Sequence, residues 1–501
     1  DWSSDVCSSD LFMKNFKRTV AGISALTFAL GLTACGGGDT ATTAPGSNDA
    51  SATQTTDATT TAATTTVTMA SEDAEAVSGA TALLRDEELE NKTIKFLSHW
   101  DINPAEGVSV PVQLGMFQEK YGGKVEWIPT TWETRYSDLS TLVLGGSGVD
   151  FFPRDEESLP KGVISGMFQP VDDYIDLDSE LWSDVAVAMD KYNFNGRHYA
   201  LISSVSADAV VLYNKQTIDE YGFDDPWELY EEGKWNWDTF SDMLQTFIES
   251  DPDKNVGLDG WWSELALYRS GGEAFIEAED GNIIVNMNSE KIERAMNNML
   301  NLYNKGLVMD KSLYDWNEQP QFMGEGRELF YITGSWAVRN PPEFWSTNIP
   351  AENLGMAPVP NSADAEHPWQ AAVLDGFCMT KGAQNPLGVA LYVECGLAAA
   401  VDEGAREVND KQCREEFKWP QDVIDHLYEI NDLARQYPVV DLAGGMSTEI
   451  ESLTTSDANK SVGLNAALHG VEWATTREEL SGALDVLVAE VVDGLEKAQN
   501  E

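Results

Sequence analysis

Short apolar segments alternate with amphipathic segments from residue 93 onward. Residues 93–97 have the pattern of a buried strand and are followed by an amphipathic stretch over residues 110–121. A second strand-like segment, 125–128, precedes a helix-like segment, 135–144, and a third strand-like segment covers 149–152. This βαβαβ order predicts a parallel sheet with helices packed on its faces. The fold class expected from the pattern is therefore α/β.

From residue 199 onward, fewer segments have a clear strand or helix pattern. Residues 199–201 and 209–213 are predicted to be strands that link two lobes. Asn236 precedes a helix-like segment as an N-cap, with Asp238 in its first turn. Three more helices are expected, over residues 289–305, 386–399 and 477–501.

The folded part, expected from residue 91, is too long for one hydrophobic core and predicts two lobes. The chain is expected to pass between them more than once. We assign residues 91–205 and 370–433 to lobe 1, and residues 206–369 and 434–501 to lobe 2.

The residues that follow the three predicted strands are candidates for a binding site. In open α/β sheets, ligands bind beyond the carboxyl ends of the parallel strands. That rule places Trp100, Asp101, Trp132, Arg154 and Asp155 on one rim of the sheet.

The first 90 residues have a different character. Residues 1–12 read like a translated sequencing adapter, and we expect the natural chain to begin at Met13. Residues 13–34 have the basic start and apolar stretch of a signal peptide, ending before Cys35 in a sequence that resembles a lipobox. Cys35 is therefore the expected lipid anchor. Residues 35–90, rich in Thr, Ala and Ser, are expected to be a disordered tether that holds the protein to the outer face of the membrane.

Composition excludes several classes of function. The chain has 84 acidic and 32 basic residues, a formal charge of −52, which disfavours nucleic acid as a partner. Cys378, Cys395 and Cys413 have no metal-like spacing, and the five histidines are scattered, so no zinc site and no cofactor is expected. One disulfide among these cysteines stays possible on the sequence alone.

Four motifs in order resemble those of family 1 extracellular solute-binding proteins, the group that includes maltose-binding and other sugar-binding lipoproteins. They are Gly-Val-Asp-Phe-Phe at 148–152, Tyr-Ala-Leu at 199–201 leading to Leu-Tyr-Asn-Lys at 212–215, Trp-Asp-x-Phe at 237–240, and a Gly-rich segment, 322–336, followed by 355–360. The resemblance implies a periplasmic-binding-protein-like fold of two α/β lobes with a hinge and an interlobe cleft. It also implies a monomer that delivers a carbohydrate to the permease subunits of an ABC importer, with no catalytic residues.

A carbohydrate site needs flat aromatic side chains against the C–H faces of the sugar and polar groups for its hydroxyls. The resemblance makes Trp336 the aromatic that reaches the sugar. Several other candidates come from predicted loops near strand ends. The substrate-binding candidates are Trp336, Trp100, Asp101, Trp132, Arg154, Asp155, Trp261, Trp262, Trp369 and Asp375. Asp375-Gly376 is also compatible with a turn.

Two alternatives stay open on the sequence alone. One is a binding protein for a different solute, such as a peptide or a polyamine, because the excess of acid suits cations. The other is a lipid-anchored glycoside hydrolase, since paired carboxylates are easy to find among 84 acids. The chain has no Gly-x-Ser-x-Gly or His-Glu-x-x-His motif.

Overall fold

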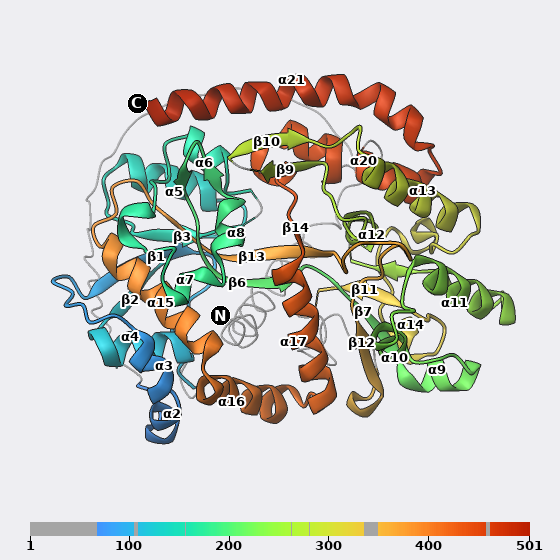
Figure 1. The fold of residues 1–501 in the computed structure, drawn as a ribbon, viewed down its shortest axis with the longest axis horizontal. Helices are drawn as coiled ribbons and strands as arrows, with labels where there is room; N and C mark the ends of the chain where they lie inside the picture. The colour runs from blue at the N-terminus through green and yellow to red at the C-terminus, as the bar shows by residue number, and fades with distance from the viewer. Residues whose placement is uncertain are drawn as a thin grey trace, which may run out of the picture.

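The computed structural model describes residues 68–500, except residues 105–108, 156, 262, 280, 335–348 and 457–460. The expected adapter sequence, signal peptide and lipid-anchor residue Cys35 lie outside the described residues, as do Trp262 and Trp336. Within the described part, the elements form two larger sheets and two small two-stranded sheets, with helices around them (Figure 1).

The first sheet contains the predicted βαβαβ unit. Its strands run in the order β14-β13-β3-β1-β2, and β6 pairs with β13. Strand β1 is parallel to both β2 and β3, as predicted, and β13 is antiparallel to β3 and β6. The strands are β1 (Thr93–Ser98), β2 (Lys124–Pro129), β3 (Phe151–Pro153), β6 (Leu201–Ala207), β13 (Gln370–Met379) and β14 (Pro438–Val439).

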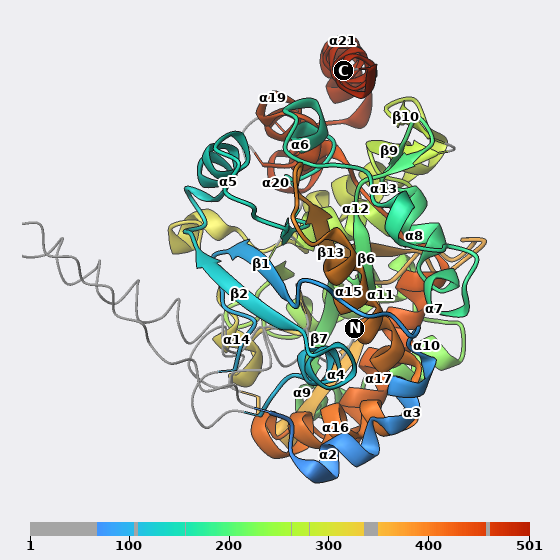
Figure 2. The same ribbon diagram turned by 90° about the vertical axis from the view of Figure 1, so that its left-hand side faces the viewer.

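The crossover helices agree closely with the sequence prediction. Helix α4 (Val112–Tyr121) connects β1 to β2, and α5 (Arg135–Leu144) connects β2 to β3. In Figure 2 these helices and strands face the viewer. Helix α15 (Pro386–Val401) packs against α4 and β6 and is buried over most of its length, which suits its apolar sequence.

The second sheet has the order β12-β7-β11-β8, with β7 antiparallel to β11 and β12 and with β11 parallel to β8. Its strands are β7 (Val210–Asn214), β8 (Asp259–Gly260), β11 (Tyr331–Thr333) and β12 (Leu354–Ala357). Two small hairpins, β4 (Asn193–Phe194) with β5 (Arg197–His198) and β9 (Ile276–Glu279) with β10 (Asn282–Val285), stand apart.

Helices surround both sheets. Asn236 caps α11 as predicted, since its side-chain oxygen accepts hydrogen bonds from the backbone N–H groups of Asp238 and Thr239, each 3.1 Å long. Further helices are α6 (Lys161–Ile164), α7 (Glu180–Ser183), α8 (Ala186–Asp190), α9 (Lys215–Tyr221), α10 (Pro226–Glu231), α11 (Trp237–Ser250), α12 (Ser263–Arg269), α13 (Glu290–Asn304), α14 (Gln321–Gly324), α16 (Glu403–Gln412), α17 (Gln421–Gln436), α18 (Ala443–Met446), α19 (Thr448–Glu451), α20 (Val462–His469) and α21 (Trp473–Asn500).

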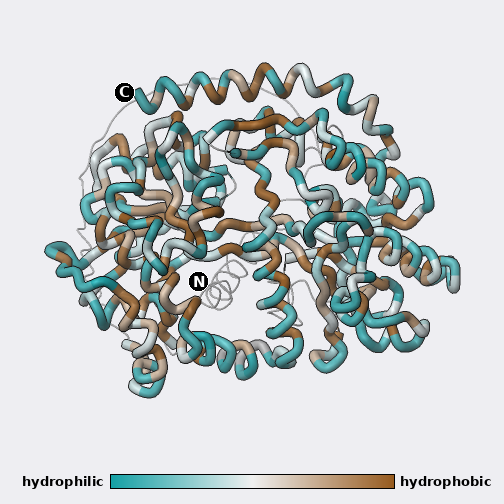
Figure 3. The backbone as a smooth tube through the Cα atoms, in the orientation of Figure 1, coloured by the Kyte–Doolittle hydropathy of each residue, from teal (hydrophilic) through white to brown (hydrophobic). Residues whose placement is uncertain are grey.

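The chain passes between the sheets at several places near the centre of the molecule. Strand β6 leads to β7 through residues 208 and 209, and β12 in the second sheet is followed by β13 in the first. Figure 3 shows hydrophobic residues along these central strands and hydrophilic residues along the outer helices. Helix α21 runs along one side of the molecule, packing on α20 and α13 near its start and on α6 near its end (Figure 1).

The folded part begins earlier than the boundary at residue 91 that we expected. Helices α2 (Ser71–Ala76) and α3 (Ser78–Leu83) lie within the expected tether and pack on α16 and α15. Val77, Ala80, Leu84 and Leu89 are buried there. These few apolar side chains are enough to dock a segment whose composition otherwise resembles a linker.

Candidate functional site

The loops that follow β1, β2 and β3 lie at one edge of the first sheet. Because β1 is parallel to both neighbours, its carboxyl end lies between theirs. His99 and Trp100 follow β1, Trp132 follows β2, and Arg154 and Asp155 follow β3. The sheet topology therefore brings the predicted rim residues, together with His99, to the same edge.

Three aromatic side chains make contact on this rim. The ring of His99 lies edge-on to that of Trp100, with centroids 4.5 Å apart, and edge-on to that of Trp132, at 5.1 Å. Burial, and then the positive charge of Arg135, lower the pKa of His99 to about 4, so its ring is neutral at physiological pH. The sequence analysis missed His99, although its place directly before Trp100 was visible.

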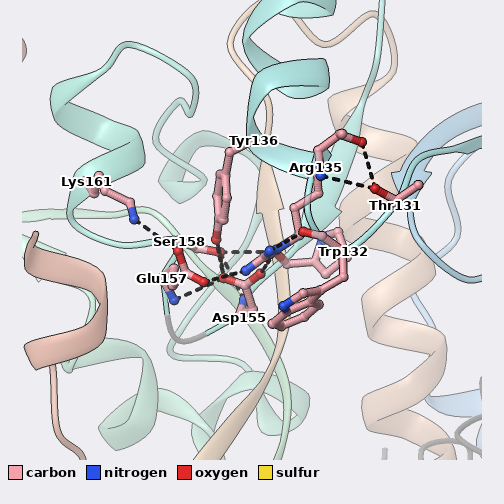
Figure 4. A network of polar contacts seen from close by, with 10 residues as sticks. Thr131, Trp132, Arg135, Tyr136, Asp155, Glu157, Ser158 and Lys161 are labelled. Atoms are coloured by element: carbon pink, nitrogen blue, oxygen red, sulfur yellow. Dashed lines mark hydrogen bonds and ion pairs between the residues drawn. The ribbon is translucent and has the colours of Figure 1, made fainter. Parts of the chain in front are cut away.

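Arg135 is at the centre of a polar network on the same rim (Figure 4). Its guanidinium carbon lies 3.6 Å from the centre of the Trp132 ring, and its Nη1 donates to the Trp132 carbonyl. Its Nε donates to Asp155 Oδ2 over 2.8 Å and its Nη2 to Glu157 Oε1 over 2.7 Å. Burial opposes the charge of Arg135, but its hydrogen bonds with Asp155 and Glu157 outweigh this and raise its pKa.

Asp155 has its acceptors engaged within the protein. Besides Arg135 on Oδ2, its Oδ1 accepts from the hydroxyl of Tyr136, from Ser158 Oγ at 3.0 Å and from the Glu157 backbone N–H at 3.0 Å. Burial, and then the Asp155 charge, raise the pKa of Tyr136, so the phenol stays protonated and donates. Asp155 thus joins the loop after β3 to the first turn of α5.

Asp101 and Arg154 have identified partners as well. Asp101 Oδ1 accepts from the backbone and side-chain nitrogens of Asn103, at 2.9 and 2.7 Å. Arg154 Nη1 donates to Tyr192 Oη over 2.8 Å, and the Arg154 backbone N–H donates to the Gly376 carbonyl. The last contact ties the loop after β3 to the middle of β13.

Asp375 lies inside β13 and not in a turn. The register between β13 and β6 shifts between Asp375 and Gly376, which is a β-bulge. Ser204 and Ser206 on β6 donate to Asp375 Oδ2 at 3.4 and 3.2 Å. A side chain at 376 would collide with the Leu201 carbonyl, 2.1 Å from the position of its Cβ, which explains glycine there.

The predicted residues of the second half of the chain lie elsewhere. Trp261 directly follows β8. Trp369 precedes β13; within the described residues, its ring contacts are with His367, Tyr437 and the Lys291 ammonium, the last at 4.9 Å. The structure therefore does not bring Trp369 into ring contact with the rim of the first sheet, and Trp262 and Trp336 lie outside the described residues.

A buried lysine lies beside Trp261. Lys311 Nζ donates to the Gly260 carbonyl over 2.9 Å and lies 3.5 to 3.8 Å from carboxylate oxygens of Asp259, Glu264 and Glu318. Burial opposes its charge, but the three carboxylates outweigh this and raise the pKa of Lys311. This cluster fixes the backbone at the carboxyl end of β8.

Trp316 is a further exposed aromatic that the sequence analysis missed. It follows the 3-10 helix η2 (Lys311–Tyr314), is 54% exposed, and its backbone N–H donates to the Lys311 carbonyl. Lys311 thus bonds both to the Trp316 backbone and to the Gly260 carbonyl directly before Trp261. The signal in the sequence was weak, because Trp316 is in a polar segment without periodicity.

No sign of metal chemistry appears in the described part of the chain. Among the described residues, no group of three or more His, Cys, Asp or Glu side chains is placed to hold a metal ion. Cys378, Cys395 and Cys413 are buried and take part in no disulfide, so the disulfide that the sequence left open does not form among them. No described helix combines the length and apolar character needed to cross a membrane.

More than half of the chain matches one known protein family. Residues 112–391, more than half of the chain, match the family model described as bacterial extracellular solute-binding protein. No catalytic activity is part of that description.

Solved structures give the same fold. The GacH receptor of Streptomyces glaucescens, solved unliganded and with acarbose, has 15% identity and a TM-score of 0.54, covering 79% of this chain and 98% of its own. A cyclo/maltodextrin-binding protein with maltotetraose has 16% identity and a TM-score of 0.55, covering 81% and 99%. An extracellular solute-binding protein of Staphylococcus aureus with maltose has 12% identity and a TM-score of 0.55, covering 81% and 99%. The predicted periplasmic-binding-protein-like fold is confirmed.

Proposed function

Because the chain belongs to the bacterial extracellular solute-binding protein family, we propose that it captures a carbohydrate between two lobes and delivers it to an ABC importer. The observation that carries this proposal is the half-exposed Trp132 ring, which lies with His99 and Trp100 at the carboxyl edge of the first sheet. A flat indole beside a neutral imidazole suits the apolar face of a sugar ring.

The binding residues are proposed for each lobe separately. Lobe 1 contributes Trp100 and Trp132 as stacking surfaces, with Asp101, Arg154 and Asp375 near the hydroxyls. Asp155 belongs to the site through Arg135. Lobe 2 contributes Trp261, Trp262, Trp336, Trp369 and, from the structure, Trp316.

Affinity requires several of these contacts together. Removing about 100 Å² of apolar surface from water contributes about 2.5 kcal/mol, whereas a micromolar dissociation constant needs about 8 kcal/mol. Association itself costs several kcal/mol more. Two or three stacked rings plus charged hydrogen bonds, each contributing about 1.5–3 kcal/mol, supply this amount.

Closure of the lobes is the proposed mechanism. The lobes comprise residues 91–205 with 370–433 and residues 206–369 with 434–501, with residues 68–90 docked on lobe 1. A ligand that contacts both lobes binds the closed form more tightly and shifts the equilibrium toward it. The permease subunits of the importer would recognise that closed form.

The cellular setting completes the proposal. Cys35 carries the lipid anchor, residues 13–34 are the signal peptide, and the protein acts as a monomer outside the cytoplasm. It performs no catalysis and needs no cofactor, since binding and closure account for delivery.

A ligand screen tests the proposal. The chain from Gly36, which lacks the anchor, is titrated with maltose, maltotetraose and acarbose, and with spermidine and a tripeptide as the alternatives. A binding saccharide at 100 times its Kd stabilises the protein by about 2.7 kcal/mol, visible in calorimetry as a raised Tm. Stabilisation by spermidine or the peptide alone would show that this solute, and not a saccharide, is the ligand. Release of reducing sugar would indicate a hydrolase.

A further inference from the structure

The contact between Arg135 and Trp132 covers one face of the indole with a buried charge. The guanidinium carbon lies 3.6 Å from the ring centre, a distance typical of cation–π stacking. Arg135 is 5% exposed, whereas Trp132 is 47% exposed. The ring therefore rests on a buried support and still presents about half of its surface to solvent.

The support is itself rigid. All three nitrogens of the Arg135 guanidinium donate: Nε to Asp155, Nη2 to Glu157 and Nη1 to the Trp132 carbonyl. Glu157 is also 3.3 Å from the Lys161 ammonium. A planar guanidinium can make these three bonds and stack at once, and a lysine ammonium cannot.

The network also joins two loops that are separate in sequence. Trp132 lies in the connection between β2 and α5, Arg135 is the first residue of α5, and Asp155 and Glu157 follow β3. Without it, the Trp132 ring would keep the edge contact with His99 but lose the contact that covers one of its faces. Ordering such a side chain on binding costs affinity, and ordering it beforehand removes that cost.

We propose that Arg135 is a positioning residue of the saccharide site, holding the Trp132 ring ready for the sugar through the stacked guanidinium and its bonds to Asp155 and Glu157. This inference rests on the proposed function. It adds a ligand preference: a ring that already faces one cation on its inner side attracts a second cation weakly on the outer side. Trp132 therefore favours a neutral sugar over a polyamine.

The first test needs no ligand. In protein labelled with 5-fluorotryptophan, the ¹⁹F resonance of Trp132 is identified as the one missing from W132F. R135K keeps the charge and loses the planar support, so this resonance shifts and broadens. R327K is the matched control, because the Arg327 guanidinium stacks on Phe322 at 3.7 Å and lies outside the proposed site. An unchanged Trp132 resonance in R135K overturns the inference.

The second test is a double-mutant cycle in which titration calorimetry measures the affinity for maltotetraose. R135K weakens binding about tenfold, the size of a lost cation–π contact. In the W132A background R135K has no further effect, since Arg135 acts only through that ring. An equal loss in both backgrounds overturns the positioning role. If R135K does not fold, E157A, which removes one hydrogen-bond acceptor of Arg135 at a more exposed position, takes its place in both tests.

The saccharide-binding function and the positioning role of Arg135 can be contradicted independently. If the wild-type protein binds no saccharide of the screen, the proposed function fails, and the fluorine spectrum alone decides whether Arg135 orders Trp132. If saccharides bind and the cycle shows no coupling, the proposed function stands and the positioning role is wrong.

Discussion

The guanidinium of Arg269, at the end of α12, lies 2.9 Å from the carboxylate of Asp208, in the two-residue link between β6 and β7. A second nitrogen of Arg269 lies 3.5 Å from Asp441, just after β14. Asp441 also accepts from the hydroxyl of the buried Tyr268. One arginine thus connects the link between β6 and β7 to the segment just after β14.

We expect Arg269→Met to destabilise the protein by about 3–5 kcal/mol, because it leaves two buried carboxylates without their cation. Arg269→Lys keeps the charge and is expected to lose less. Denaturant unfolding measures both variants. A loss below about 1 kcal/mol for the Met variant would show that the link between β6 and β7 does not depend on this ion cluster.

The docking of residues 68–90 gives a second prediction. Arg85 pairs with Glu394 of α15 at 2.9 Å, and the Glu394 side chain is nearly buried. A chain that starts at residue 91 leaves Glu394 without its cation, with the Trp182 indole still donating to it over 3.1 Å, and exposes the apolar surface that Val77, Ala80 and Leu84 cover. We expect it to be less stable than a chain that starts at residue 68, by roughly 3 kcal/mol. Equal melting temperatures for the two chains would show that residues 68–90 belong to the tether and do not stabilise the fold.

Much of the fold was predictable because its signals are local. Helix α5 (Arg135–Leu144) was predicted with both ends correct, and β1, β2 and α4 within two residues. These segments combine a clear hydrophobic period with short connections. Asn236 as the cap of α11 was predictable for the same reason, since a cap bonds to residues two and three positions away.

The candidate site was only partly predictable, because its contacts are not local. Topology alone placed Trp132 and Asp155 at one edge. The Arg135 pairing with Asp155 joins the first residue of α5 to the loop after β3, 20 positions away in the sequence. In a chain with 84 acidic residues, no pattern singles out one such carboxylate. Asp155, predicted as a sugar contact, also accepts hydrogen bonds from Arg135, Tyr136 and Ser158, which no local pattern in the sequence indicates.

The lowered pKa of His99 predicts how stability depends on pH. The folded pKa of about 4 is below the ordinary value of 6.5, so the unfolded chain binds the proton more readily. The stabilisation that the neutral His99 ring gives the folded state is complete above pH 6.5 and is lost as pH falls through about 4. The free energy of unfolding changes by roughly 3 kcal/mol in all. H99Q should lack this component, and an NMR titration should place the His99 midpoint near 4. A midpoint near 6.5 would mean that the ring is solvated.

Glu277 on β9 makes the free energy of unfolding depend on pH in the opposite direction, because it stabilises the folded state at low pH. Burial raises its pKa to about 7, from 4.5, although the charge of Lys191 lowers it. The folded state binds this proton more tightly, so the contribution is complete below pH 4.5 and is lost as pH rises through about 7, roughly 3 kcal/mol. E277Q should therefore gain stability relative to the wild type from pH 4.5 to pH 7.5. The exposed Glu279→Gln on the same strand is the control, and an equal gain there would contradict the assignment.

The exposed indoles give the most direct prediction about binding. Trp132 lies beside β2 in the first sheet, and Trp316 lies beside Lys311 and the carboxyl end of β8 in the second. If the two rings stack on one saccharide from opposite lobes, each alanine substitution weakens maltotetraose binding at least about tenfold, since each removes about 100 Å² of apolar contact. Stability should change little, because about half of each side chain is already in solvent.

The combination of the two changes tests whether both rings serve the same ligand. Rings that act independently on one ligand give a double-variant loss equal to the product of the single losses. Tyr303→Ala is the control, since Tyr303 is an exposed aromatic on α13 outside the proposed site. Titration calorimetry measures all four proteins. If W132A weakens binding and W316A does not, the sugar contacts of lobe 2 come from other residues than Trp316, and the saccharide stacks on the first lobe without it.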